Sequence, residues 1–170
     1  MSRSGYSDDC DNWALIRWRG AVESAIRGKR GQATLRDLVD ALDALPEQRL
    51  AADSLVTADG DYCALGAIGR ARGMDMAPID PEDRQAVARA FGVSGALAAE
   101  IMFLNDESAS DERHPINFVV CGPMRKWENH TQLRWETNPN AGRIRWGQMR
   151  AWAVANLRPP EEALAARGQR

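Results

Sequence analysis

The segment TLRDLVDALDALP, residues 34–46, predicts an amphipathic helix and with it a helical fold. Apolar residues recur three and four positions apart, which places them on one side of a helix (Leu35, Leu38, Val39, Leu42 and Leu45). Thr34 is an N-cap residue with Asp37 three positions later, and Pro46 cannot continue a helix. We therefore expect a helix that begins after Thr34, ends before Pro46 and is covered by other elements along its apolar stripe.

The same signals predict further helices on both sides of this segment. On the N-terminal side, apolar positions at helical spacing run over Trp13–Arg27, and Gly28 and Gly31 end the run. On the C-terminal side, capping residues and glycine stops predict four more helices: Ala64–Arg72, one that opens at Asp80–Asp83 and runs to Phe91, one from Ser94 to about Leu104, and Arg145–Asn156. The total is about six helices.

Two regions predict small β-hairpins. Leu55–Cys63 has an Asp-Gly turn at its centre, and Ile116–Cys121 resembles a strand for which His130–Glu136 is the candidate partner. The predicted fold class is mainly α (α+β): a single compact domain over residues 1–157, with one or two small hairpins. Residues 158–170 follow a pair of prolines and are predicted to form a mobile C-terminal tail.

Composition excludes several classes of protein. The chain has 170 residues, a net charge of −2 and three cysteines with no Cys-x-x-Cys pair, which disfavours a disulfide scaffold or a structural metal site. No apolar run approaches the roughly 18 residues of a membrane span, and the N-terminus does not resemble a signal peptide. No phosphate-binding loop or dinucleotide fingerprint is present. We expect a cytoplasmic protein with no membrane contact, metal or cofactor, and the sequence indicates no oligomeric state.

Charge and tryptophan are distributed unevenly. Residues 121–170 carry a net charge of +5 and residues 1–120 carry −7, and all six tryptophans lie in the two basic flanks of the chain. Either the basic flanks pack beside the acidic middle, or they form a face for a partner. Tryptophan and arginine are frequent interface anchors, so we predict a partner-binding set in the C-terminal flank: Arg125, Lys126, Trp127, Arg134, Trp135, Arg143, Arg145 and Trp146. Trp18 and Trp152 lie on apolar stripes and are predicted core residues.

Two further polar features, Cys63 and the pair Asn105-Asp106, are weaker candidates for a functional site. Cys63 lies between a turn and the start of a helix, where the helix dipole would lower a thiol pKa, so it is a candidate nucleophile with His114 or His130 as base. The alternative is a small buried residue, which is the commoner role of cysteine. Asn105-Asp106 ends a predicted helix and is a polar motif without an assigned role.

Several stretches resemble a group of uncharacterised bacteriophage and prophage proteins. They are Arg27–Gln32, Leu35–Leu38, Ala41–Pro46, Asp59–Ala67, Phe91–Val93, Ala98–Ile101, Asn105–Glu107 and Met149–Trp152. The similarity covers most of residues 14–107 and the last helix. It implies a related fold but no established activity. The chain departs from the group over Ile116–Arg143, which contains Trp127, Trp135, Cys121 and His130, and this insertion is a candidate partner-binding region.

These observations lead to one main hypothesis and two alternatives. The main hypothesis is a phage accessory protein that binds a host macromolecule in the host cytoplasm, as a host-takeover or anti-defence (anti-CRISPR-type) inhibitor does, with a host protein as the expected partner. The first alternative is a protein that binds single-stranded nucleic acid or nucleotides through the Arg/Trp-rich C-terminal segment. The second is a small enzyme that uses Cys63. We expect a binding protein rather than an enzyme.

Overall fold

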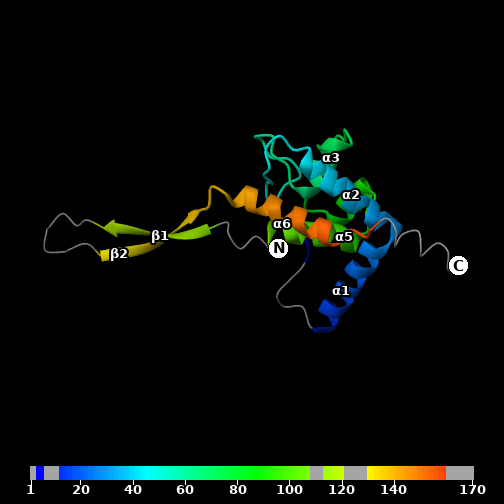
Figure 1. Cartoon of the computed structure of the whole chain (residues 1–170), viewed down its shortest axis with the longest axis horizontal. Helices are drawn as coiled ribbons and strands as arrows, with labels where there is room; N and C mark the ends of the chain where they lie inside the picture. The colour runs from blue at the N-terminus through cyan, green and yellow to red at the C-terminus, as the bar shows by residue number, and fades with distance from the viewer. Residues whose placement is uncertain (1–2, 6–11, 108–112, 121–129, 160–170) are drawn as a thin grey trace.

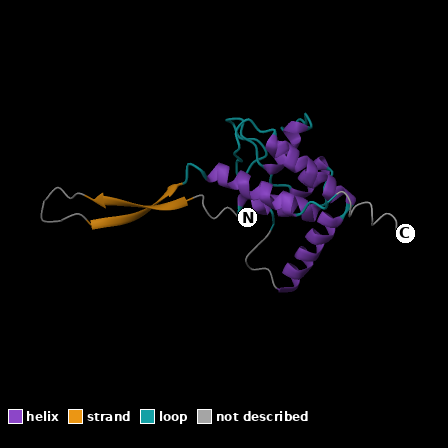
Figure 2. Ribbon diagram, viewed as in Figure 1, coloured by secondary structure: helices purple, strands orange, loops and turns teal. Residues whose placement is uncertain are grey.

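The computed structural model describes residues 3–5, 12–107, 113–120 and 130–159. This part of the chain is mainly α, as Figure 2 shows. It contains six helices and one two-stranded sheet. In chain order the elements are α1 (Asn12–Arg27), α2 (Lys29–Asp43), α3 (Ala64–Ala71), α4 (Arg84–Phe91), α5 (Gly95–Asp106), β1 (Arg113–Val120), β2 (His130–Thr137) and α6 (Ala141–Ala155).

Helix α2 lies at the centre of the helical body. It packs against α1, α3 and α6, and its side chains Leu35, Leu38 and Leu42 are fully buried. The predicted apolar stripe is therefore confirmed as the core. Around it lie the apolar residues of α3, α4, α5 and α6, which together form one cluster.

The start of α2 differs from the prediction. The helix begins at Lys29 with Gly28 as N-cap, and Thr34 lies inside it, where its hydroxyl donates to the Arg30 carbonyl oxygen at 2.9 Å. The glycines form a tight junction between α1 and α2 instead of a longer break. A Cβ on Gly31 would overlap the Ala25 carbonyl oxygen, so only glycine lets the two helices approach this closely.

Side-chain caps and a glycine stop define α4 and α5. The Asp83 carboxylate accepts from the backbone N–H groups of Gln85 and Ala86, and the Ser94 hydroxyl accepts from that of Leu97. Gly92 ends α4 with φ +68°, a left-handed conformation that favours glycine. Among the described residues, no single helix is long and apolar enough to cross a membrane. Only α4 and α5 taken together, bent by 109°, have that length and composition.

Helix α6 begins at Ala141, four residues before the predicted start at Arg145. It contributes Met149 and Ala153 to the core, while Trp152 is half-buried against it. The predicted hairpin at Leu55–Cys63 is reduced to one isolated bridge, between Val56 and Tyr62, around a turn.

Strands β1 and β2 form an antiparallel hairpin that extends away from the helices (Figure 1). In its register Pro115 faces Trp135 and Ile116 faces Arg134 across the two strands. The extensive contacts of each strand are with the other strand, and α6 follows β2 after three residues. Cys121, the end of the predicted first strand, lies outside the described residues.

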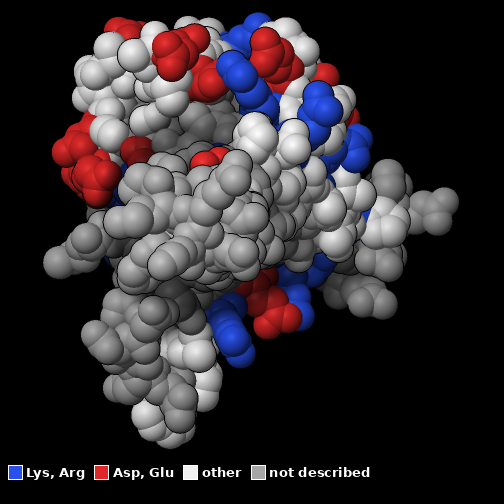
Figure 3. Space-filling model, turned by 90° about the vertical axis from the view of Figure 1, so that its left-hand side faces the viewer, with Lys and Arg blue, Asp and Glu red and all other residues white. Residues whose placement is uncertain are grey.

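Acidic residues of the middle of the chain pair with basic residues of the C-terminal flank and of the middle itself. Arg150 of α6 donates two hydrogen bonds to the Asp43 carboxylate of α2, at 2.6 and 2.9 Å. Arg72 pairs with Asp37 at 2.6 Å. Figure 3 shows acidic and basic side chains side by side over the helical body on the face toward the hairpin. The charge separation along the sequence is therefore partly neutralised in space.

Candidate functional site

The predicted partner-binding residues fall into three groups. Arg134 and Trp135 lie in β2, and Arg143 is exposed in the first turn of α6, close in sequence to the end of the hairpin. Arg125, Lys126 and Trp127 belong to the segment that joins β1 to β2 and lie outside the described residues. Arg145 and Trp146 form the third group and are placed in the helical body.

Arg145 is corrected from a surface residue to a buried one, whereas Trp146 is half-buried and bonded to the helical body. Arg145 is only 4% exposed, and its Nη1 donates to the Leu50 carbonyl oxygen at 2.7 Å. The Trp146 indole N–H donates to the Leu42 carbonyl oxygen at 3.0 Å, and the ring packs against the core. The Trp146 bond holds α6 against the last turn of α2, and the Arg145 bond holds it against the loop that follows α2. The burial of Arg145 could have been predicted from the sequence, because Arg145 lies four residues before the core residue Met149 and shares its helix face.

Cys63 directly precedes α3, as predicted, and is its N-cap; its thiol is buried, which agrees with the alternative of a small buried residue. Its Sγ accepts from the Gly66 backbone N–H at 3.4 Å, and the residue is 3% exposed. Burial raises the pKa of the Cys63 thiol, although the nearby Arg3 guanidinium opposes this shift. The expected lowering by the helix dipole is therefore wrong. His114 belongs to β1 and His130 to β2, and the hairpin that these strands form extends away from the helices (Figure 1).

Asn105 connects three separate parts of the chain. Its Oδ1 accepts from the Ala64 backbone N–H at 3.0 Å, and its Nδ2 donates to the Ala51 carbonyl oxygen at 2.8 Å and to Asp106 at 2.7 Å. The side chain is buried, so these bonds satisfy polar groups that water does not reach. Asn105 holds the end of α5, the start of α3 and the loop at Ala51 together.

Asp106 anchors the N-terminal segment through a buried ion pair. Its Oδ2 accepts from Arg3 Nε at 2.9 Å and from Nη2 at 2.6 Å, with only 3% of the Arg3 side chain and 5% of the Asp106 side chain exposed. Its Oδ1 also accepts from the Asp53 backbone N–H at 3.1 Å. Sequence reasoning missed Arg3, because one arginine near a terminus carries no periodic or motif signal.

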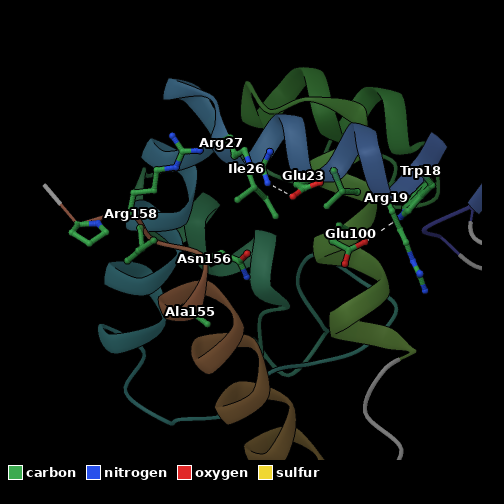
Figure 4. Close-up of a pocket in the computed structure, with 12 residues that line it drawn as sticks. Trp18, Arg19, Glu23, Ile26, Arg27, Glu100, Ala155, Asn156 and Arg158 are labelled. Carbon is green, nitrogen blue, oxygen red and sulfur yellow. Dashed lines mark hydrogen bonds and ion pairs between the residues drawn. The ribbon is translucent and has the colours of Figure 1, made fainter. Parts of the chain in front are cut away.

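A groove separates α1 from the end of α6 and is shown in Figure 4. We call it the α1–α6 groove. It has a volume of about 420 Å³ and is lined by one side of α1 from Trp18 to Arg27, by Glu100 of α5, and by residues 155–159. The Trp18 indole N–H donates to Glu100 Oε2 at 3.1 Å, and Arg27 pairs with Glu23. Apolar and charged side chains thus meet in one concave site.

Gln32 shapes one end of the α1–α6 groove. Its Nε2 donates to the carbonyl oxygens of Ile26 at 3.0 Å and Asn156 at 2.9 Å, and its Oε1 accepts from the Arg158 backbone N–H at 2.8 Å. Gln32 is 6% exposed, so this network is largely shielded from water. It fixes the end of α1 beside the chain that leaves α6.

Comparison with known proteins adds no assignment to these sites. No protein-family model, curated protein or solved structure matches the chain. Within the described ranges, no group of three or more His, Cys, Asp or Glu side chains is placed to hold a metal ion.

Proposed function

We propose that the chain is a phage or prophage accessory protein that binds a host macromolecule through its hairpin. The observation that carries this proposal is the position of β1 and β2, which extend from the helical body and pair mainly with each other. An isolated two-stranded hairpin is only marginally stable in water, so a hairpin outside the body is suited to contacts with another molecule.

The sequence of the hairpin favours a protein partner. Residues 113–137 contain Trp127 and Trp135 together with Arg125, Lys126 and Arg134. Tryptophan and arginine are the side chains most enriched among strong interface contacts. The same segment also contains Glu128 and Glu136, so its basic excess is modest compared with what a phosphate backbone usually attracts. The exposed Arg143 extends this set onto α6.

The host target rests on sequence resemblance, whereas binding by the hairpin rests on geometry. The resemblance to phage and prophage proteins covers the helical segments and departs over Ile116–Arg143. We infer that the helices are the common scaffold and that the hairpin is the part specific to this chain's partner. A catalytic role for Cys63 has less support, because its thiol is buried with a raised pKa.

Capture from a host lysate tests the proposal. The tagged full chain is compared with a triple variant, Trp127→Ala, Trp135→Ala and Arg143→Ala, with and without nuclease, and retained proteins are identified by mass spectrometry. We expect one host protein to be retained after nuclease and lost in the triple variant. The melting temperature of the variant should stay within about 2 °C of the wild-type value.

Trp13→Ala is the matched control, because Trp13 is 72% exposed on α1. This variant should retain the partner. Equal loss in the control and the triple variant would contradict binding by the hairpin. Loss of all capture on nuclease treatment would instead support the nucleic-acid alternative.

A further inference from the structure

We propose that the α1–α6 groove is a nucleotide site, with an amino-substituted base beside Trp18 and phosphate between Arg27 and Arg158. This site is separate from the hairpin and does not depend on the proposed function. The volume of about 420 Å³ lies within the range of small-molecule sites. The groove also differs in chemistry between its two ends, which Figure 4 shows.

The first end combines an aromatic ring with a hydrogen-bond acceptor, and Arg19 of α1 also lines it. Trp18 is held by its bond to Glu100 at 3.1 Å, and the Arg84 guanidinium lies 6.0 Å from the centre of its ring. Val22 lines the same part of the groove. A flat base can pack against these apolar surfaces. The Glu100 carboxylate only accepts hydrogen bonds, so it favours a base with an exocyclic amino group, as in adenine, guanine or cytosine.

The second end presents two guanidinium groups. Arg27 is the last residue of α1, and Gln32 holds the backbone of Arg158 beside it. Among the residues that the structure describes, Arg158 forms no ion pair and Arg27 pairs with Glu23 alone. Guanidinium groups bind phosphate through paired, charge-assisted hydrogen bonds. Since α1 and α6 both end here, their dipoles disfavour an anion, and binding must depend strongly on these arginines.

The order of groups along the groove selects a whole nucleotide over its parts. A bare phosphate would leave the Trp18 and Glu100 end unfilled. A nucleoside would leave the arginine end without an anion. A nucleotide places an apolar ring, an amino donor and an anion at the positions where the groove has an apolar surface, an acceptor and cations.

Isothermal titration calorimetry on the full chain tests this site, with ADP, UDP, adenosine and pyrophosphate as probes. We expect ADP to bind at least about tenfold more tightly than each of the other three, which corresponds to roughly one lost charged hydrogen bond or ring contact. Arg158→Ala should weaken ADP binding by about tenfold or more. This variant keeps the backbone N–H that Gln32 uses, so the fold is retained.

Arg36→Ala is the matched control, because Arg36 is exposed on α2 and does not line the groove. It should bind ADP as the wild-type protein does. Glu100→Ala should reduce the preference for ADP over UDP. The proposal is overturned if ADP gives no heat at millimolar concentration, if pyrophosphate binds as tightly as ADP, or if Arg158→Ala and Arg36→Ala behave alike. Binding of a single-stranded oligonucleotide without binding of ADP would overturn it as well.

Discussion

The helical body and the hairpin are stabilised in different ways. The body contains a buried apolar cluster, and polar groups such as Asn105 and the Arg3–Asp106 pair connect its segments internally. The hairpin is held mainly by pairing between its own two strands. The difference indicates that folding depends mainly on the body, and it leaves the hairpin available for the partner binding proposed above. The predictions below test that division, beginning with the largest effect.

Asp106→Ala should destabilise the body most. The change leaves the Arg3 guanidinium buried without its carboxylate, and removing one partner of a buried ion pair costs about 3–5 kcal/mol. Urea denaturation followed by circular dichroism measures the loss. Asp43→Ala is the control, because Asp43 pairs with Arg150 at the surface. Similar losses in the two variants would contradict the anchoring role of Asp106.

Arg145→Ala should destabilise the body by a smaller amount. The change removes a buried donor to the Leu50 carbonyl oxygen, and leaving such a group without its partner costs about 1–3 kcal/mol. Arg143→Ala, two residues earlier and exposed, should change stability by less than about 0.5 kcal/mol. Thermal denaturation of both variants compares them directly. If Arg143→Ala proved the more destabilising, the assignment of Arg145 to the interior would be wrong.

Cys63 should make the body less stable at alkaline pH. Its thiol pKa is raised in the folded protein, so the unfolded chain releases that proton at a lower pH than the folded chain does. The stabilisation is therefore complete below the unfolded thiol pKa, about 8.5, and decreases as pH rises above it. Denaturation at pH 8 and pH 10 should show a steeper loss for the wild-type protein than for Cys63→Ala. Equal slopes would contradict the burial of the thiol.

Trp135→Ala should have the smallest effect on stability. Trp135 lies in β2, which extends from the helices, so the change should alter the free energy of unfolding of the body by no more than about 0.5 kcal/mol. Near-ultraviolet circular dichroism and thermal melting measure this. A loss of several degrees in melting temperature would show that the hairpin contributes to the body.

Local sequence patterns were sufficient to predict much of the body. The spacing of Leu35, Leu38 and Leu42 identified the central helix, because a 3.6-residue period places them on one face. Ser94 and Gly92 were predicted as a cap and a stop, since each acts on backbone groups a few residues away. The boundaries of α2 and α6 were wrong by several residues. The α1–α2 junction depends on a close approach at Gly31, which no local pattern reveals.

Long-range contacts could not be predicted in the same way. Arg3 and Asp106 are 103 residues apart, and Gln32 is 124 residues from Asn156, whose carbonyl oxygen accepts its hydrogen bond. Such pairs depend on the packing of complete helices and leave no short-range signature. Arg145 belongs to the predicted partner-binding set, yet it contacts the body instead, while Arg150 pairs with Asp43 as the alternative of basic flanks packed beside the acidic middle predicts. Composition identified the flank as rich in arginine, but only the fold distinguishes the arginines that contact the helical body from the others.

Amide hydrogen exchange tests the division between body and hairpin most directly. It is measured on the free protein and on its complex with the host protein retained in the capture experiment. We predict new protection in β1 and β2 on binding, with unchanged exchange for the central helix α2, which is already buried. Protection confined to the helices, with the hairpin exchanging as it does in the free protein, would contradict the proposal that the hairpin binds the partner.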